Sequence, residues 1–412
     1  MSIKPNKTVI IITDFDFDKP SGAGFSRMEN YSKALKFAGR EVTWISPSYD
    51  YKSPIKLLKK ESYNVLISES KKTYQSTFST LHFKRIKQFL KDSNRLLIQE
   101  YGDIKGAPIF IYSSNLPMVW HALFYLKRRL GHKVYIEKNE LQTAIALNIL
   151  TQSTSAFKTA VLIIFKPINI ITGFIADALA IWFNGIIVIS TKFEKTYNRF
   201  QKNMIRIPIL VEDKGYNRKI ENGQGYKFKI GYFGWVGETK DGVFSLIKAV
   251  ERINNSSITK ITLDIFGPGS KVNIIELDEI CKQNKKIVYG GNLSTEEVGQ
   301  KLTEYSLLAF PRPLNLQTKF GFSTKLAEFM ASGVPVLTTN VSDNSIFIKD
   351  GVNGFLIQGK RRIDIKQLIN KIEEIVSMEQ NERNQIGNKG RQAALKHFNP
   401  LSYSSKLSDF LG

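Results

Sequence analysis

Residues 319–337 read KFGFSTKLAEFMASGVPVL, and this stretch decides the fold of the second half of the chain. A polar loop leads into a short helix, which ends at Ser332-Gly333. An apolar strand at Val334–Leu337 follows directly. A helix that passes straight into a strand is typical of a βαβ unit, so the stretch predicts a parallel sheet with crossover helices.

The beginning of this helix is suited to binding an anion. The first backbone N–H groups of a helix have no partner within it and lie at the positive end of its dipole. Ser323 or Thr324 is placed to cap the helix, and Lys325 in the first turn is placed to meet an anion. Glu328 lies three residues further on the same face, where a carboxylate can accept both hydroxyls of a ribose. The alternative is an ordinary surface pair of Lys325 and Glu328, worth roughly 0.2–0.5 kcal/mol.

Working outward from this helix, strand and helix patterns alternate along the whole chain. The polar, glycine-containing stretch 211–227 interrupts them and reads as a linker. We therefore predict an N-terminal domain at 1–210, a C-terminal domain at 228–395, and a last helical segment at 396–412 that packs back toward the N-terminal domain. The strand candidates are Thr8–Thr13, Glu41–Ile45, Leu96–Gln99, Pro108–Tyr112, Lys133–Glu137, Ile186–Ile189, Phe228–Phe233, Ile261–Phe266, Ile287–Tyr289, Leu307–Phe310, Val334–Leu337 and Gly354–Ile357.

The segment 321–328, GFSTKLAE, resembles the donor-binding signature of retaining GT-B glycosyltransferases of the family-four type, the glycosyl transferases group 1. Relatives usually carry two glutamates seven residues apart. The second matches Glu328, which the resemblance assigns to the donor ribose, while Phe320 occupies the position of the first. The resemblance implies an α/β GT-B fold, with two Rossmann-like domains facing each other across a cleft. It also implies transfer with retention of anomeric configuration.

Other segments of the C-terminal half resemble the same family in order and spacing. In 230–242, IGYFGWVGETKDG, Lys240 matches a lysine that the family uses on the donor diphosphate, and Trp235 occupies the position of an arginine, for which Lys325 is a substitute. The segments 264–269, 289–292 and 349–357 resemble further turns of the domain. The donor-binding residues implied are Gly237, Lys240, Gly321, Phe322, Ser323, Thr324, Lys325 and Glu328.

The N-terminal half carries two shorter resemblances. Residues 21–27, SGAGFSR, follow the first strand and resemble the family's acceptor-side loop, with Gly22, Gly24 and Arg27 as its residues; the alternative is a tight βα turn. Residues 135–141, YIEKNEL, resemble a strand end at which Glu137 or Glu140 would face the cleft. We favour Glu140 because it lies further past the strand, and a solvated loop residue is the alternative. The catalytic candidates are Glu140, Lys240 and Lys325.

We expect neither a metal nor a cofactor; a nucleotide-diphosphate sugar is the co-substrate. The run 14–18, DFDFD, matches the Asp–x–Asp pair that binds metal in the GT-A architecture, but here it follows the first strand of a GT-B-like domain. Its aromatic residues are expected to pack inward. The four histidines show no ligand spacing, and Cys281 is the single cysteine, which excludes an internal disulfide or a cysteine-based metal site.

A formal net charge of +22 indicates a polyanionic partner, unless it reflects only a lysine-rich surface. No nucleic-acid-binding signature is present, so we expect no nucleic acid. The stretches 80–91 and 120–130 predict basic amphipathic helices that suit an anionic leaflet, or helices that pack on their own sheet. Residues 161–181 contain Lys166, Pro167 and Asp177, which argues against a membrane span and for a surface or buried helix. We predict no signal peptide, and a cytoplasmic protein peripheral to the inner face of the cell membrane.

These observations predict a glycosyltransferase that moves a sugar from a nucleotide-diphosphate sugar to a glycan or lipid-linked acceptor. Polysaccharide or surface-glycan biosynthesis is the expected pathway. Two alternatives remain. One is a nucleotide-sugar epimerase on the same fold, and the other is a non-catalytic GT-B binding protein with a degenerate site, which Phe320 and Trp235 favour.

Overall fold

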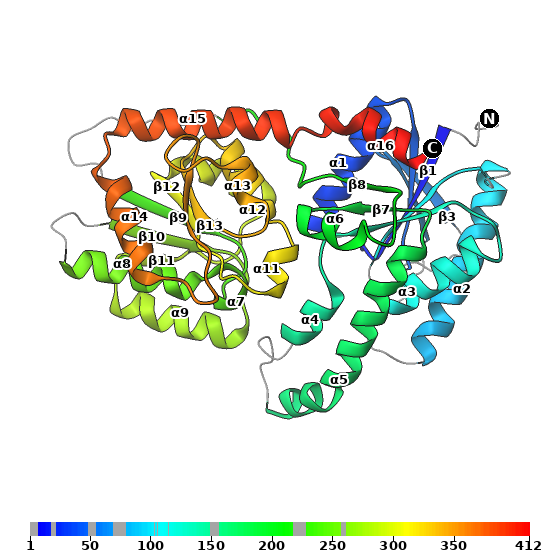
Figure 1. Ribbon diagram of the computed structural model, residues 1–412, viewed down its shortest axis with the longest axis horizontal. Coiled ribbons are helices and arrows are strands. Elements are labelled where there is room, and N and C mark those ends of the chain that lie inside the picture. Colours follow the sequence, from blue (N-terminus) through cyan, green and yellow to red (C-terminus); the bar gives the residue numbers. More distant parts are fainter. Residues whose placement is uncertain are drawn as a thin grey trace. The chain divides into compact units, whose positions relative to one another are not determined.

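Two α/β units, each with its own sheet, make up the computed structural model (Figure 1). The first comprises the described residues within 1–147, 166–210 and 400–412, and the second those within 148–165 and 211–399. The predicted linker is described only as far as residue 216, so the predicted boundaries at 210, 227 and 395 stay predictions. The structure describes residues 7–17, 22–47, 55–68, 80–102, 104, 106–113, 115–148, 156–216, 228–256 and 261–412.

The first unit contains an eight-stranded sheet within these described ranges, in the order β3-β4-β2-β1-β5-β6-β7-β8. β3 runs antiparallel to β4, and every other neighbouring pair is parallel. β1 is buried along its whole length because its sequence, TVIIIT, suits a strand covered on both faces. The strands are β1 (Thr8–Thr13), β2 (Glu41–Ile45), β3 (Ile55–Lys59), β4 (Asn64–Ser68), β5 (Ile109–Tyr112), β6 (Val134–Lys138), β7 (Gly185–Val188) and β8 (Met204–Arg206).

The second unit contains a parallel sheet in the order β11-β10-β9-β12-β13-β14. The chain order reverses between β9 and β12. In such open sheets ligands bind outside the carboxyl ends of the strands at this reversal, so the fold itself points to one edge of the sheet. The strands are β9 (Phe228–Phe233), β10 (Ile261–Phe266), β11 (Ile287–Tyr289), β12 (Leu307–Phe310), β13 (Val336–Asn340) and β14 (Phe355–Gln358).

Helices connect most of the parallel strands (Figure 1). Those of the first unit are α1 (Ala23–Phe37), α2 (Thr80–Tyr101), α3 (Leu116–His121), the π-helical stretch η2 (Ala122–Lys127), α4 (Gln142–Asn148), the 3₁₀ turn η4 (Ala180–Trp182), α6 (Thr191–Tyr197) and α16 (Ser404–Leu411). α5 (Ala156–Leu179) belongs to the first unit from residue 166 onward. Those of the second unit are α7 (Glu238–Asp241), α8 (Val243–Ser256), α9 (Lys271–Gln283), α10 (Thr295–Lys301), α11 (Leu316–Phe320), α12 (Thr324–Ala331), α13 (Asn344–Phe347), α14 (Ile365–Ser377) and α15 (Gln380–His397).

The last helix of the chain completes the core of the first unit. Leu407 and Leu411 of α16 are buried in one cluster with Tyr31, Trp44 and Phe110. Sixteen of the eighteen buried residues in this cluster lie before residue 211, and Leu407 and Leu411 join them only after the chain has built the second unit.

The predicted strand at Leu96–Gln99 is wrong, because these residues lie inside α2. Leu96 and Leu97 are buried and Ile98 is exposed, which is the pattern of one helix face. A short apolar run does not distinguish a strand from a buried helix turn by periodicity. The other strand candidates are confirmed with small shifts of their ends, whereas β3, β4 and β8 were not predicted.

The apolar stretch 161–181 is helical and belongs to α5, with Pro167 inside the helix. Across the described parts of the chain, no helix is both long and apolar enough to cross a bilayer.

Candidate functional site

The predicted donor residues gather at the carboxyl ends of β9 and β12, where the order of the second sheet reverses. β9 ends at Phe233 and leads through a glycine-containing turn into α7, which carries Lys240. β12 ends at Phe310 and leads to α11, after which α12 carries Lys325 and Glu328. Two segments that are distant in sequence thus meet at the edge where ligands bind in such sheets.

Asp241 is the buried centre of this site. The Lys325 ammonium lies 2.8 Å from Asp241 Oδ2, and the Arg312 Nε lies 3.4 Å from Oδ1. The Tyr232 hydroxyl donates to Oδ2 at 3.2 Å. The Arg312 Nε also donates to the Lys240 carbonyl at 3.2 Å, which ties β12 to α7. One carboxylate therefore holds two cations from different elements.

The site carries a net positive charge. Burial raises the pKa of Asp241, but Lys325 and Arg312 outweigh that effect and leave the pKa below its ordinary value. Asp241 is therefore ionised at neutral pH, and its single negative charge faces two buried or nearly buried cations. Lys240 adds a third positive charge close enough to affect the pKa values of both Asp241 and Lys325. Such an excess of buried positive charge favours an anionic ligand.

Glycine 234 makes room for the Lys325 side chain. Its φ is +147°, and a Cβ at this position would lie 1.9 Å from Lys325 Cε. A Cβ on Gly267, at the end of β10, would lie 2.1 Å from the Gly234 carbonyl oxygen. The turns after β9 and β10 therefore need residues without a side chain if Lys325 is to lie against them.

Glu328 lies half-buried on α12 with its carboxylate available. Within the described parts of the chain it accepts no hydrogen bond from protein atoms, and burial raises its pKa despite the nearby charges of Lys214 and Lys325. Lys214 belongs to a segment that Arg391 holds through the carboxylate of Asp213 at 2.8 Å. A buried carboxylate without a protein donor is suited to the hydroxyl groups of a ligand.

The beginning of α12 lies in the same site. Ser323 is the N-cap residue, and its side chain makes no capping hydrogen bond. The Phe322 ring is buried against Phe347 and Phe398, with ring centroids 5.3 and 5.9 Å away, so the backbone of Phe322 is the part that faces the helix start. Phe320, at the end of α11, is also buried. The roles predicted for Gly321, Phe322, Ser323 and Thr324 stay predictions.

Sequence reasoning missed three residues of this site, namely Asp241, Arg312 and Lys214. Asp241 directly follows Lys240, which the motif singled out, so an acidic residue beside a lysine predicted to bind phosphate was a usable signal. Arg312 lies two residues past the end of the buried strand β12. Its place at the carboxyl end of a strand, where ligands bind in such sheets, was a usable signal. Lys214 gave no signal, because it lies in a stretch that reads as linker.

In the first unit, the predicted residue Arg27 is buried, and each of its three guanidinium nitrogens donates a hydrogen bond within the protein. Its Nε lies 2.5 Å from Glu137 Oε1, and its Nη1 and Nη2 donate to the carbonyls of Pro208 and Ile207 at 2.6 and 2.9 Å. Tyr31 also donates to Glu137 Oε1, at 3.1 Å. Burial raises the pKa of Glu137, and Arg27 opposes this effect. Arg27 and Glu137 therefore join α1, β6 and the segment after β8, which leaves no guanidinium nitrogen directed at a ligand phosphate.

Glu140 lies at the carboxyl end of β6, in the loop just past Asn139. Asn139 donates to the Tyr112 hydroxyl at 2.9 Å, and the charge of Glu140 contributes to a raised pKa of Tyr112, whose largest cause is burial. A Cβ on Gly24 would lie 3.0 Å from the Tyr112 hydroxyl oxygen. The structure thus brings the predicted Gly24 and Glu140 to one edge of the first sheet, around Tyr112.

The run DFDFD is described only up to residue 17. Its Asp14 carboxylate accepts hydrogen bonds from Ser113 and from Asn115, the latter at 3.1 Å, and the Phe15 ring packs 5.6 Å from that of Phe25. In the described ranges, no three His, Cys, Asp or Glu side chains are grouped so that they could hold a metal ion.

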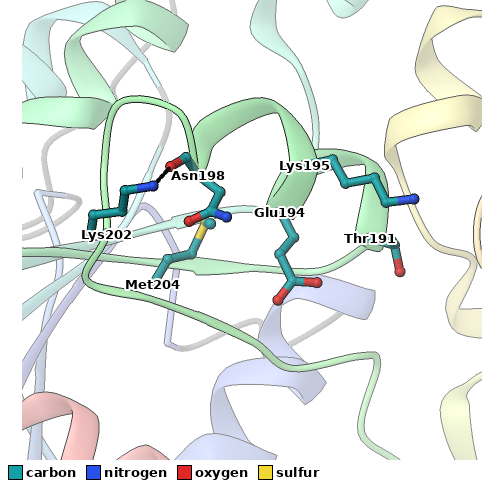
Figure 2. Close-up of a pocket in the computed structure, with 6 residues that line it drawn as sticks. All are labelled: Thr191, Glu194, Lys195, Asn198, Lys202 and Met204. Carbon is teal, nitrogen blue, oxygen red and sulfur yellow. Dashed lines mark hydrogen bonds between the residues drawn. The ribbon is translucent and has the colours of Figure 1, made fainter.

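A surface pocket of about 240 Å³ lies beside α6 in the first unit and is lined by none of the predicted residues (Figure 2). Its polar groups are engaged locally: Lys202 donates to the Asn198 carbonyl at 2.8 Å, and Glu194 pairs with Arg206 at 3.2 Å. We assign it no role. The lining residues are Thr191, Glu194, Lys195, Asn198, Lys202 and Met204.

Comparison with known proteins agrees with the fold. Residues 215–393 match the model of the family described as glycosyl transferases group 1. No curated protein sequence matches the chain. The structure is similar to that of sucrose-phosphate synthase from Thermosynechococcus elongatus, with a TM-score of 0.72 at 15% identity over 98% of both chains.

Two further similar structures are complexes with UDP or a UDP-sugar analogue. HepE from Anabaena in complex with UDP and glucose has a TM-score of 0.62 at 14% identity, over 97% of this chain and 98% of that one. Trehalose-6-phosphate synthase from E. coli bound with UDP-2-fluoro glucose has a TM-score of 0.66 at 11% identity over 98% of both chains. The predicted GT-B fold is confirmed, and residues 215–393 form a domain of the glycosyl transferases group 1 family.

Proposed function

We propose that the protein transfers a sugar from a nucleotide-diphosphate sugar to a glycan or lipid-linked acceptor, with retention of anomeric configuration. One observation carries the proposal. Lys325 projects from a buried, net positive cluster at the strand reversal of the second sheet, and an available carboxylate, Glu328, lies three residues further along the same helix. This pair suits the two parts of a nucleotide diphosphate, the phosphates and the ribose.

The charge arrangement matches the needs of such a transfer. The bond between the anomeric carbon and the diphosphate oxygen breaks, a bond from that carbon to an acceptor oxygen forms, and the acceptor hydroxyl gives up its proton. Negative charge grows on the leaving diphosphate, where Lys325 and Lys240 would stabilise it. We assign the acceptor to the first unit, with Gly22 and Gly24 in its loop and Glu140 as the candidate group for the hydroxyl proton.

The ligands of similar structures support a nucleotide-sugar donor, since two of these structures hold UDP or a UDP-sugar analogue. A third similar structure is a lipopolysaccharide outer core galactosyltransferase, with 13% identity and a TM-score of 0.62. We extend this to polysaccharide or surface-glycan biosynthesis on the inner face of the cell membrane. We further propose that no metal takes part, so transfer should continue at full rate in EDTA.

A thermal-shift screen against nucleoside diphosphates and nucleotide sugars tests the donor site. A ligand at 100 times its Kd should add about 2.7 kcal/mol to the free energy of unfolding. The shift should come from one nucleotide family and vanish in Glu328→Ala. The matched control is Glu276→Ala, an exposed glutamate on α9 of the same unit, which should keep the full shift.

Two outcomes would favour the alternatives. No shift from any nucleotide, with folded protein, would indicate a degenerate binding protein, for which the buried Phe320 is the feature in favour. A shift accompanied by conversion of the donor into its epimer, without any acceptor, would indicate an epimerase. Transfer of labelled sugar to an added acceptor extract distinguishes both from the proposed activity.

A further inference from the structure

Helix α5 displays an apolar ridge on the surface of the first unit. The side chains of Ile171 and Phe174 are 57% and 65% exposed, and Trp182, just after the helix, is 57% exposed. Single exposed apolar residues are ordinary, but a contiguous exposed row marks an interaction surface. The ridge consists of Ile168, Ile171, Phe174, Ile175 and Trp182.

The opposite face of α5 anchors the helix to its own unit. A Cβ on Gly173 would lie 2.8 Å from the backbone carbon of Gln142, so α5 lies directly against the start of α4. Asp177 accepts hydrogen bonds from the backbone N–H groups of Gln142 and Thr143 at 3.1 and 3.0 Å, and pairs with Lys138 at 2.6 Å. Since 173 and 177 occupy one helix face, the ridge residues at 168, 171 and 175 point the other way.

Basic side chains lie at one end of the ridge and on helices of the same unit. Lys127 of η2 donates to the Trp182 carbonyl at 2.5 Å, and exposed Arg128 and Arg129 follow it directly. α3 packs against α2, and Figure 1 shows α2 and α5 on either side of α3. α2 presents an exposed stripe at helical spacing, Lys84, Lys87, Lys91 and Arg95.

We propose that the α5 ridge and the basic residues of α2 and η2 form the surface that docks on an anionic lipid bilayer. Exposed isoleucine and phenylalanine insert between headgroups, tryptophan lies at the interface, and lysine and arginine pair with anionic headgroups. In a dimer formed through this surface, the cations of one copy would face the same cations of the other copy. An anionic surface instead complements both the local charges and the net charge of +22. The inference deepens the proposed peripheral location by naming the residues responsible.

Co-sedimentation of the full-length protein with lipid vesicles tests this surface. The protein should bind vesicles that contain phosphatidylglycerol, and it should bind phosphatidylcholine vesicles far more weakly. The double variant Ile171→Glu/Phe174→Glu should lose at least tenfold in vesicle affinity. Phe37→Glu is the matched control, because Phe37 is 69% exposed at the end of α1 outside the ridge, and it should bind like the wild type.

The basic stripe is tested separately. Each of Lys84→Glu and Lys87→Glu should weaken binding to anionic vesicles by about fivefold at low salt, since a basic residue near an anionic surface contributes on the order of a fivefold gain. Raising the salt concentration should reduce the difference between variant and wild type.

Undiminished vesicle binding by the ridge double variant would overturn the proposal, as would equal binding to neutral and anionic vesicles. A concentration-dependent dimer that the ridge variant abolishes, together with no vesicle binding, would assign the ridge to a second copy instead. The nucleotide thermal shift of each variant serves as a folding control. Because the ridge lies in the first unit and the donor site in the second, a failed donor site and a failed docking surface give separate readouts.

Discussion

At the scale of single residues, Asp241 is the group on which the predicted donor site depends. It is buried and holds Lys325 and Arg312, so its removal leaves two cations without their counter-charge. Asp241→Asn should lower the free energy of unfolding of the second unit by about 3–5 kcal/mol. Chemical denaturation at pH 7 measures this, with Asp278→Asn on the surface of α9 as the control that should change little.

The burial and ion pairs of Asp241 also predict how the stability of the second unit depends on pH. The folded-state pKa of Asp241 lies below its ordinary value, so its stabilising effect is complete above about pH 4 and is lost as the pH falls through the folded-state pKa. The stability difference between the wild type and Asp241→Asn should therefore narrow below about pH 4. A difference that stayed constant down to pH 2 would show that the charge of Asp241 is not what stabilises the unit.

The effect of Glu328 on stability should depend on pH with the opposite sign. Burial raises its folded-state pKa, so ionising it costs stability as the pH rises above the ordinary value, whereas the group is neutral in both states at lower pH. Glu328→Gln should raise the melting temperature of the ligand-free protein at pH 7 by roughly 1–3 °C while it weakens nucleotide binding. The gain should vanish at pH 4. A variant that bound nucleotide normally would remove Glu328 from the donor site.

At the scale of elements, the turn after β9 determines where Lys325 lies. Gly234→Ala would force a Cβ into the space of Lys325 Cε at a φ that alanine disfavours. We expect at least a tenfold loss in kcat/KM for the donor, with the fold retained. Gly299→Ala on α10, where the nearest atom would be 3.7 Å from the new Cβ, is the control that should keep full activity.

The helices show where local pattern is sufficient and where it is not. α12 was predicted from capping residues, a terminal glycine and helical spacing, which are all local. The predicted strand at Leu96–Gln99 is wrong because its three apolar residues fit a strand and a helix face equally well. The long stretch of α5 was ambiguous between a buried and an exposed helix, and only its contacts through Gly173 and Asp177 determine which face points outward.

At the scale of the whole molecule, the C-terminal helix belongs to the core of the first unit. Leu407 lies in that core, and Leu407→Ala should cost the first unit about 2–5 kcal/mol. Calorimetry with saturating nucleotide should show a lower first-unit transition and an unchanged second-unit transition. Leu401→Ala, at an exposed position, is the control. Equal loss in both transitions would mean that the two units unfold as one.

The sequence by itself determined that the chain has two largely parallel sheets, and it predicts that Lys240, Lys325 and Glu328 share one donor site, because strand patterning, helix ends and motif spacing are properties of neighbouring residues. The tertiary structure alone decided the partners of those residues. Lys325 meets Asp241 across 84 residues, and Arg27 meets Glu137 across 110, through the order of strands in each sheet. Charge pairing between distant segments depends on burial and geometry that no local spacing encodes, which is why Arg27 read as a ligand contact and proved to be an internal one.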